Sequence, residues 1–151
     1  MYTLNREQFL PISPEVAWDF FSSPANLGKI TPPGMGFKII SGAGEPDIKE
    51  GQIIEYIVKP LLQIPLRWKT KILDVNKPDQ FKDIQLSGPY TIWEHTHRFV
   101  PENGGIKMFD EVKYKLPGGI IGRLMHWLFV RKKVEFIFDY RFNILQKTFI
   151  K

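Results

Sequence analysis

The chain contains no cysteine among its 151 residues. This absence excludes disulfides, thiolate nucleophiles, zinc ribbons and iron–sulfur clusters held by thiolates. No apolar run approaches the roughly 20 residues of a membrane-spanning helix, so we expect no integral membrane span. The phosphate-binding loop, the GxSxG nucleophile motif and the HExxH zinc motif are also absent. The first residues lack the apolar stretch of a signal peptide, and we therefore expect a cytoplasmic protein.

The net charge is positive, at +5, but the basic residues are dispersed along the chain. The only dense group is Arg131-Lys132-Lys133. Nucleic-acid binding usually requires a basic stripe or patch, and scattered lysines on outer strand faces are typical of a solvated surface. We therefore expect no nucleic-acid partner.

The length predicts one domain over residues 1–151. Seven segments have the residue alternation of strands and are separated by turn residues, which indicates an antiparallel sheet. They cover residues 2–10, 37–41, 52–59, 66–75, 81–87, 90–100 and 106–116.

Two short helices are predicted between the first two strands. Ser13-Pro14 is typical of a helix start, with serine as N-cap and proline in the first turn, and Ser23-Pro24 repeats the signal. A long amphipathic helix is predicted over residues 119–147. Its apolar seam is expected to face the concave side of the sheet. The seam consists of Ile120, Leu124, Trp127, Val134, Phe138, Phe142 and Leu145, and Arg131 falls on it between Trp127 and Val134.

The most informative segment runs from Gly88 to Phe99. Strand alternation places Trp93, His95, His97 and Phe99 on one face. A plain core would rarely hold two neighbouring imidazoles, because a buried polar ring needs hydrogen-bond partners. This face therefore indicates the wall of a binding cavity.

The order of these elements, together with several short motifs, resembles the SRPBCC (START/Bet v 1-like) superfamily, in particular small bacterial ligand-binding or polyketide cyclase/dehydrase-like domains. The resemblance covers nearly the whole chain. It implies an α+β helix-grip fold, with the seven-stranded sheet curved around the C-terminal helix and an apolar cavity between them. The motifs that carry it are Ile12–Trp18, Asn26-Leu27, Thr31-Pro32-Pro33, Gly88-Pro89-Tyr90, the Trp93–Phe99 row, Asp110, Val112, Tyr114, Pro117, Phe129-Val130-Arg131 and Phe138-Asp139-Tyr140-Arg141.

A polar cluster is predicted to line that cavity. It can be read as a satisfied buried network, as a set that orients a ligand, or as a catalytic site in which His97 and Asp110 act as a general base pair. His95 and His97, with Asp110 or Asp83, also have a spacing that could bind a metal, but strand alternation alone produces such pairs, and we assign neither a metal nor a cofactor. The members are Asp83, Gln85, His95, His97, Asp110 and Arg131.

Aromatic side chains from the sheet and the long helix are predicted to converge on the same interior, as core packing or as walls for an apolar ligand. They are Tyr56, Trp68, Trp93, Phe99, Tyr114 and Trp127. Residues 125–133 could instead contact a membrane surface or a second copy in a homodimer. The loops 43–51 and 61–65 are candidates for a gate at the cavity mouth.

The sequence therefore favours binding of an apolar or amphipathic small molecule, such as a lipid or polyketide, in an internal cavity. The alternative is a cyclase or dehydratase that uses His97 and Asp110. A third possibility is a partner-interaction domain.

Overall fold

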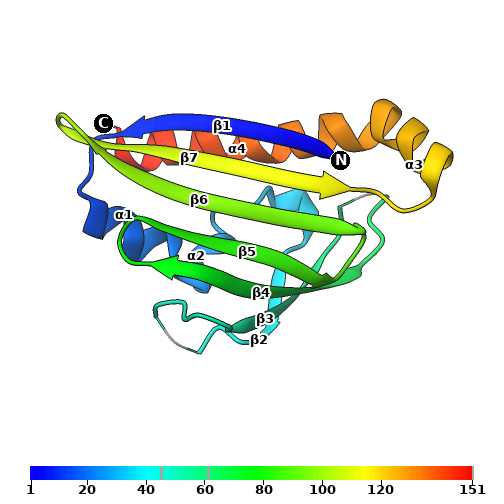
Figure 1. Cartoon of the computed structure of the whole chain (residues 1–151), viewed down its shortest axis with the longest axis horizontal. Coiled ribbons are helices and arrows are strands. Elements are labelled where there is room, and N and C mark those ends of the chain that lie inside the picture. The colour runs from blue at the N-terminus through cyan, green and yellow to red at the C-terminus, as the bar shows by residue number, and fades with distance from the viewer. Residues whose placement is uncertain (45, 61, 151) are drawn as a thin grey trace.

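One antiparallel sheet of seven strands forms the body of the computed structural model, which describes residues 1–44, 46–60 and 62–150. The strand order is β1-β7-β6-β5-β4-β3-β2, so the first strand pairs with the last. Figure 1 shows the curved sheet with α4 running along it. The strands are β1 (Tyr2–Leu10), β2 (Lys38–Ser41), β3 (Ile53–Val58), β4 (Leu66–Asn76), β5 (Gln80–Ser87), β6 (Ile92–Glu102) and β7 (Gly105–Lys115).

The predicted strand faces are confirmed in the middle of the sheet. His95, His97 and Phe99 on β6 are buried, whereas Glu94 and Arg98 on the opposite face are exposed. The inward residues of β7 are likewise buried, because the tight turn at Asn103-Gly104 pairs Glu102 with Gly105 and fixes the register of this hairpin.

The helices between β1 and β2 begin where the sequence predicts. The Ser13 hydroxyl accepts a hydrogen bond from the Val16 N–H at 3.3 Å, and Pro14 is the first residue of α1 (Pro14–Phe21). The second helix, α2 (Pro24–Leu27), is a single turn and is followed by the 3₁₀ turn η1 (Pro33–Met35). The predicted helix-grip arrangement is thus confirmed.

The C-terminal helix is interrupted, which the sequence periodicity does not predict. A π-helical turn, η2 (His126–Val130), lies between α3 (Gly119–Met125) and α4 (Arg131–Phe149). The Arg131 N–H donates to the His126 carbonyl, five residues earlier, as a π turn requires.

The wide π turn changes the phase of the buried seam. From α3 to α4 the inward residues are Gly122, His126, Val130, Val134, Phe138, Arg141 and Leu145. The predicted seam is therefore correct at Val134, Phe138 and Leu145 and wrong at Ile120, Leu124, Trp127 and Phe142, which are exposed.

The loop at 46–51 is anchored rather than free. Ile48 is buried against the core, and its N–H donates to the Ser22 carbonyl at 3.2 Å. Leu62 and Ile64, in the turn after β3, are exposed. Parts of both candidate gates, at positions 45 and 61, lie outside the described residues. Among the described helices, none is long and apolar enough to cross a membrane.

The two halves of the C-terminal helix should differ sharply in their contribution to stability. Leu145 is completely buried, so Leu145→Ala should lower the free energy of unfolding by about 2–5 kcal/mol. Leu124 is 54% exposed, and Leu124→Ala should change it by less than about 0.5 kcal/mol. Urea unfolding of both variants measures the difference, and equal losses would contradict the observed helix phase.

Candidate functional site

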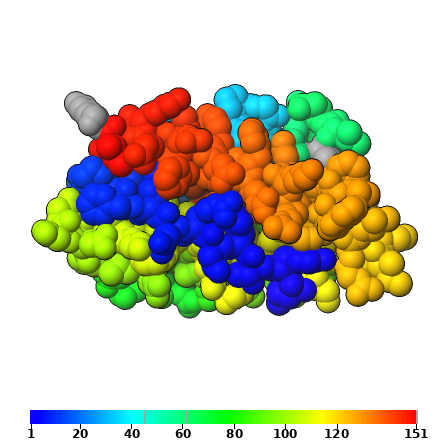
Figure 2. Space-filling view, turned by 90° about the horizontal axis from the view of Figure 1, so that it is seen from above, coloured from blue at the N-terminus to red at the C-terminus, as the bar shows by residue number. Residues whose placement is uncertain are grey.

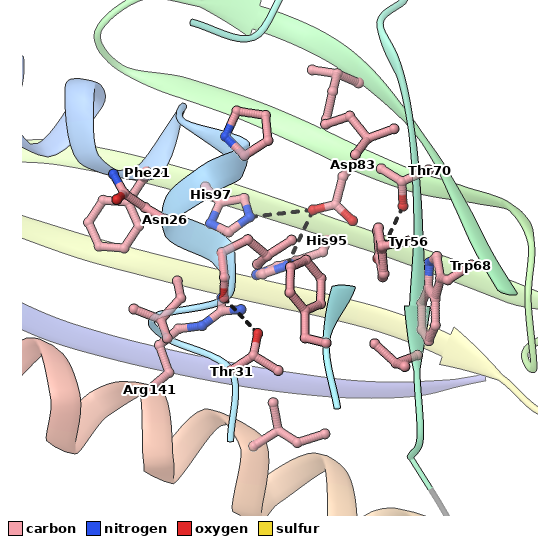
Figure 3. A pocket seen from close by; sticks show the side chains of 18 of the residues that line it. Phe21, Asn26, Thr31, Tyr56, Trp68, Thr70, Asp83, His95, His97 and Arg141 are labelled. Carbon is pink, nitrogen blue, oxygen red and sulfur yellow. Dashed lines mark hydrogen bonds and ion pairs between the residues drawn. The ribbon is translucent and has the colours of Figure 1, made fainter. Parts of the chain in front are cut away.

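A partly enclosed cavity of about 150 Å³ lies between the concave side of the sheet, α2 and α4. Figure 3 shows the side chains that project into it. Its lining is mainly apolar and includes Phe20, Phe21, Leu27, Ile30, Met35, Phe37, Ile48, Ile54, Val58, Ile72, Phe81, Ile137 and Phe138. A dry apolar cavity of this size can hold a compact apolar group about as large as benzene.

Three ionisable side chains meet at one wall of the cavity: Asp83 from β5, and His95 and His97 from β6. Asp83 Oδ2 lies 3.4 Å from His95 Nδ1 and 3.4 Å from His97 Nε2 (Figure 3). The pairing of β5 with β6 explains this convergence, because Asp83 is directly opposite His95. His95 and His97 follow by strand alternation, with ring centroids 3.8 Å apart.

Asp110 lies on the far side of the two imidazoles, where β7 places it directly opposite His97. His95 Nε2 and Asp110 Oδ1 form a hydrogen bond of 2.8 Å, in which the imidazole donates because an ionised carboxylate can only accept. His97 Nδ1 is 3.1 Å from the same oxygen but lacks hydrogen-bond alignment. Arg141 Nη1, from α4, approaches this oxygen at 3.7 Å.

Electrostatics keeps both carboxylates ionised despite their burial. Burial alone would raise the pKa of Asp83 and Asp110, but the facing imidazoles outweigh it and hold both pKa values well below the usual range. Burial would lower the pKa of His95, yet its hydrogen bonds to Asp110 and Asp83 raise it above the ordinary value. The cluster is thus a buried ionic network with one wall open to the cavity.

Three of the predicted aromatic residues form another part of the lining: Tyr56, Trp68 and Trp93. The Trp68 and Trp93 rings meet edge to face at 5.2 Å. Tyr56 stacks on Trp68 at 6.0 Å, and its hydroxyl is 3.5 Å from Thr70 Oγ1. Burial raises the pKa of Tyr56, so its hydroxyl stays protonated. Together they provide an angled aromatic wall with one hydroxyl group.

Four other predicted residues lie on the sheet but do not line the cavity: Gln85, Phe99, Asp110 and Tyr114. Asp110 is hidden behind the imidazoles, as described above. Gln85 Nε2 donates to the Tyr90 carbonyl at 2.6 Å, and Phe99 stacks on Phe21 at 5.3 Å in the core. The Tyr114 hydroxyl pairs with His126 Nε2 at 2.9 Å. Each faces the predicted side of its strand but lies beyond the end of the cavity or under other side chains.

Two residues that the sequence pattern places in the lining do not lie there. Trp127 is 70% exposed, and Arg131 is exposed with its Nε donating to Glu135 at 2.9 Å. Trp127 lies within the π turn, which rotates its side chain away from the sheet. Arg131 lies at the start of α4, where Val130 and Val134 pack against the sheet instead. Arg141, almost three turns further along α4, is the buried arginine near Asp110.

The residues that close the cavity opposite the sheet were not predicted from the sequence. Phe20, Phe21 and Leu27 come from α1 and α2, and Ile30 and Thr31 from the segment that follows. The one available signal was the pair of phenylalanines on the apolar face of α1. Arg141 had a signal too, since it lies three residues after Phe138 and four before Leu145.

Comparisons by sequence give no relative: no family model matches the chain, and no curated protein matches it significantly. Solved structures do match. The protein TTHA0849 from Thermus thermophilus has a TM-score of 0.75 at 16% identity, over 97% of this chain and 95% of that one. Ginseng major latex-like protein 151 from Panax ginseng has a TM-score of 0.69 at 11% identity, over 99% and 98%.

A third match is partial: a nucleoside-diphosphate sugar epimerase from Corynebacterium glutamicum has a TM-score of 0.58 at 23% identity, over 78% of this chain but 25% of that one. At such identities the likeness defines the fold alone. The chain therefore has the Bet v 1-like helix-grip fold.

Removal of the Asp110 charge should strongly destabilise the protein. Asp110→Asn leaves the buried Arg141 and the two imidazoles without their shared carboxylate, which should cost about 3–5 kcal/mol of unfolding free energy. Asp139→Asn is the matched control, since its pair with Arg6 is exposed and should contribute less than about 1 kcal/mol. Chemical denaturation with a chelator present measures both, and a loss below about 1 kcal/mol for Asp110→Asn would refute the network.

Proposed function

We propose that this protein binds an apolar or amphipathic small molecule, of the lipid or polyketide kind, in the cavity between the sheet and α4. The observation that carries the proposal is a mainly apolar cavity with a single buried ionic cluster at its wall. Binding sites for small molecules have this composition, in which apolar walls provide affinity and a few polar groups fix orientation. The expected setting is the cytoplasm, a prediction that rests on the sequence alone.

The lining suggests how such a molecule would be oriented. Trp68, Trp93 and Tyr56 would pack against the apolar body of the ligand, since aromatic rings provide a large contact area. His95 and His97 would face a polar end of the ligand, and Arg141 also lines the cavity. A compact apolar group with one oxygen-bearing end therefore suits the site better than a bulky polycyclic molecule.

A cyclase or dehydratase activity is the alternative, because His97 faces the cavity with Asp110 behind it, 3.1 Å from Nδ1. A neutral imidazole backed by a carboxylate can take a proton from a carbon next to a carbonyl. An enzyme would consume the bound molecule, whereas a carrier would release it unchanged. The partner-domain alternative does not need a cavity, and its one supporting feature is the exposed apolar surface of α3.

Native mass spectrometry of the purified protein, followed by solvent extraction, tests the proposal directly. We expect a defined apolar molecule at near-stoichiometric amount. Straight-chain fatty acids of increasing length, added to stripped protein, should raise the melting temperature, because a ligand that binds only the folded state stabilises it. The chain length with the largest shift would report the depth of the cavity.

Filling the cavity should abolish this effect. Val58 is buried and lines the cavity, so Val58→Phe should reduce fatty-acid affinity at least about tenfold while the apo protein stays folded. Val100→Phe adds the same volume on the exposed face of β6 and should leave affinity unchanged. Thermal shift titrations compare them. Equal affinity in both variants, or no shift with any chain length, would contradict the proposal.

A further inference from the structure

The three cavity-facing ionisable side chains have the donor set of a metal site. We propose that Asp83, His95 and His97 bind one divalent transition-metal ion, of which Zn²⁺ is the probe. Two imidazole nitrogens and one carboxylate oxygen suit Zn²⁺, Fe²⁺ or Cu²⁺ rather than the oxygen-seeking Mg²⁺ and Ca²⁺. The proposal concerns the metal alone and does not depend on the organic ligand.

The distances support this assignment. Asp83 Oδ2, His95 Nδ1 and His97 Nε2 all lie within 4.8 Å of one another. The oxygen is 3.4 Å from each nitrogen. Donors around tetrahedral Zn²⁺, with bonds of about 2.1 Å, are about 3.4 Å apart. An ion could therefore enter between the oxygen and the nitrogens with little movement of the three side chains.

Asp110 orients the His95 ring for this role and lies beside the His97 ring. It accepts the hydrogen bond from His95 Nε2 and lies 3.1 Å from His97 Nδ1, on the side away from Asp83. Histidine ligands usually give their second N–H to such a carboxylate, which fixes the tautomer and the ring orientation. The hydrogen bond fixes this tautomer for His95, so in the neutral ring Nδ1, which faces Asp83, carries a lone pair. In the corresponding neutral tautomer of His97, Nε2 carries one.

Metal binding displaces the protons that link Asp83 to the imidazoles, and three lone pairs then converge at one point. Arg141 approaches Asp110 rather than this point, and the ion-pair partners of Asp83 in the described part of the chain are the two imidazoles. Buried acceptors that face one another are costly unless a proton or a cation lies between them. A divalent cation binds the lone pairs of all three atoms at once.

The geometry leaves the ion accessible. All three ligands line the cavity, so a fourth coordination position would face the cavity interior. Zinc sites with three protein ligands and one open position accept water or a ligand there. If the proposed function also holds, an oxygen-bearing end of the bound molecule would occupy that position.

Calorimetric titration of chelator-stripped protein with Zn²⁺ tests the site, with the visible spectrum of Co²⁺ as the second readout. We expect one ion per chain and the intense Co²⁺ bands of a tetrahedral site. His97→Ala and Asp83→Asn should each lose at least about a hundredfold in affinity. Asp110→Asn removes a positioning residue and also weakens the fold, so it is measured in the temperature range where circular dichroism shows it folded. It should lose about ten- to a hundredfold in affinity and retain altered Co²⁺ bands.

His126 provides the matched control, because it is the third histidine of the chain and pairs with Tyr114 away from the cluster. His126→Gln should bind Zn²⁺ as the unmodified chain does. Circular dichroism establishes whether each variant is folded. If His97→Ala or Asp83→Asn is unfolded, Asp83→Ala takes its place as the variant that lacks one metal ligand. If Zn²⁺ does not bind stoichiometrically, or if binding is lost in His126→Gln instead of His97→Ala, the proposal is wrong and a shared proton occupies the cluster.

A separate feature is an exposed apolar surface on α3 and η2, termed here the α3 face. Its members are 39–76% exposed: Ile120, Ile121, Leu124, Trp127, Leu128 and Phe129. Figures 1 and 2 show that this segment forms one end of the molecule. Contiguous exposed apolar side chains of this size are typical of a docking surface.

The charges around the α3 face identify the kind of partner. Residues 112–134 contain six basic and no acidic residues. Lys113 and Arg131 form ion pairs with Glu111 and Glu135 just outside this range, which leaves Lys115, Arg123, Lys132 and Lys133 as the main source of positive charge. A second copy of the chain would bring the same positive charges against them. An anionic phospholipid surface complements them, and aromatic and aliphatic residues beside lysine and arginine are typical of an interfacial helix. We therefore infer that the α3 face docks on anionic membranes.

Vesicle co-sedimentation tests this inference. Binding should be strong to phosphatidylcholine vesicles that contain phosphatidylglycerol, and weak to phosphatidylcholine alone or at high salt. The double variant Trp127→Ala/Ile121→Gln should reduce vesicle binding at least about tenfold. The single variants Lys132→Gln and Lys133→Gln should each reduce it about fivefold. Val100→Gln, at an exposed position on β6, is the control and should have no effect. Equal binding by all variants would refute the inference, as would a dimer in sedimentation analysis that Trp127→Ala dissociates.

Discussion

The pairing of a cluster of ionisable side chains under the C-terminal helix is the constraint on which this structure depends. His95, His97, Asp110 and Arg141 are buried, and Asp83 is partly buried at the cavity wall. Each would be costly alone, since an unpaired buried charge is several kcal/mol less stable than a solvated one. Their pairing requires β5, β6 and β7 to keep one register, because a slip of one residue would turn every side chain to the other face. The curvature of the sheet, the position of α4 and the polarity of the cavity wall are thus linked.

Strand periodicity explains why the sheet could be predicted. A period of two leaves only two choices of face, and the aromatic residues that flank His95 and His97 decide between them. The predicted inward set on β7, which includes Met108, Asp110 and Val112, is buried for the same reason. The motif at Ser13-Pro14 was equally local, since the N-cap bond involves residues three apart.

The buried face of the C-terminal helix was harder to predict, because any irregular turn shifts the predicted orientation of every residue on one side of it. The π turn adds about one residue to a turn, and every position before it rotates relative to α4. A sequence pattern with constant 3.6-residue periodicity therefore places Trp127 inward. Arg141 lies beyond the π turn, in uninterrupted α4, and the pattern selected the neighbouring apolar residue Phe142 in its place. The extent of the cavity was also beyond a sequence argument. Tyr114 lies on the same side of the sheet as His97, yet of the two only His97 lines the cavity. The limits of the cavity are set by the tertiary packing of α1 and α2, which a strand pattern does not predict.

Stability alone does not account for the ionic cluster. Well-packed apolar residues of similar size at such positions are often as stable as a buried ion pair, or more so, and they need no exact register. The surrounding core, with Phe81, Phe99 and Phe138, provides the apolar environment for such a replacement. What an apolar core could not provide is a set of lone pairs directed into an otherwise apolar cavity. The proposed binding of a cation or of the polar end of a ligand would account for both the cluster and its position at the cavity wall, whereas packing accounts for neither.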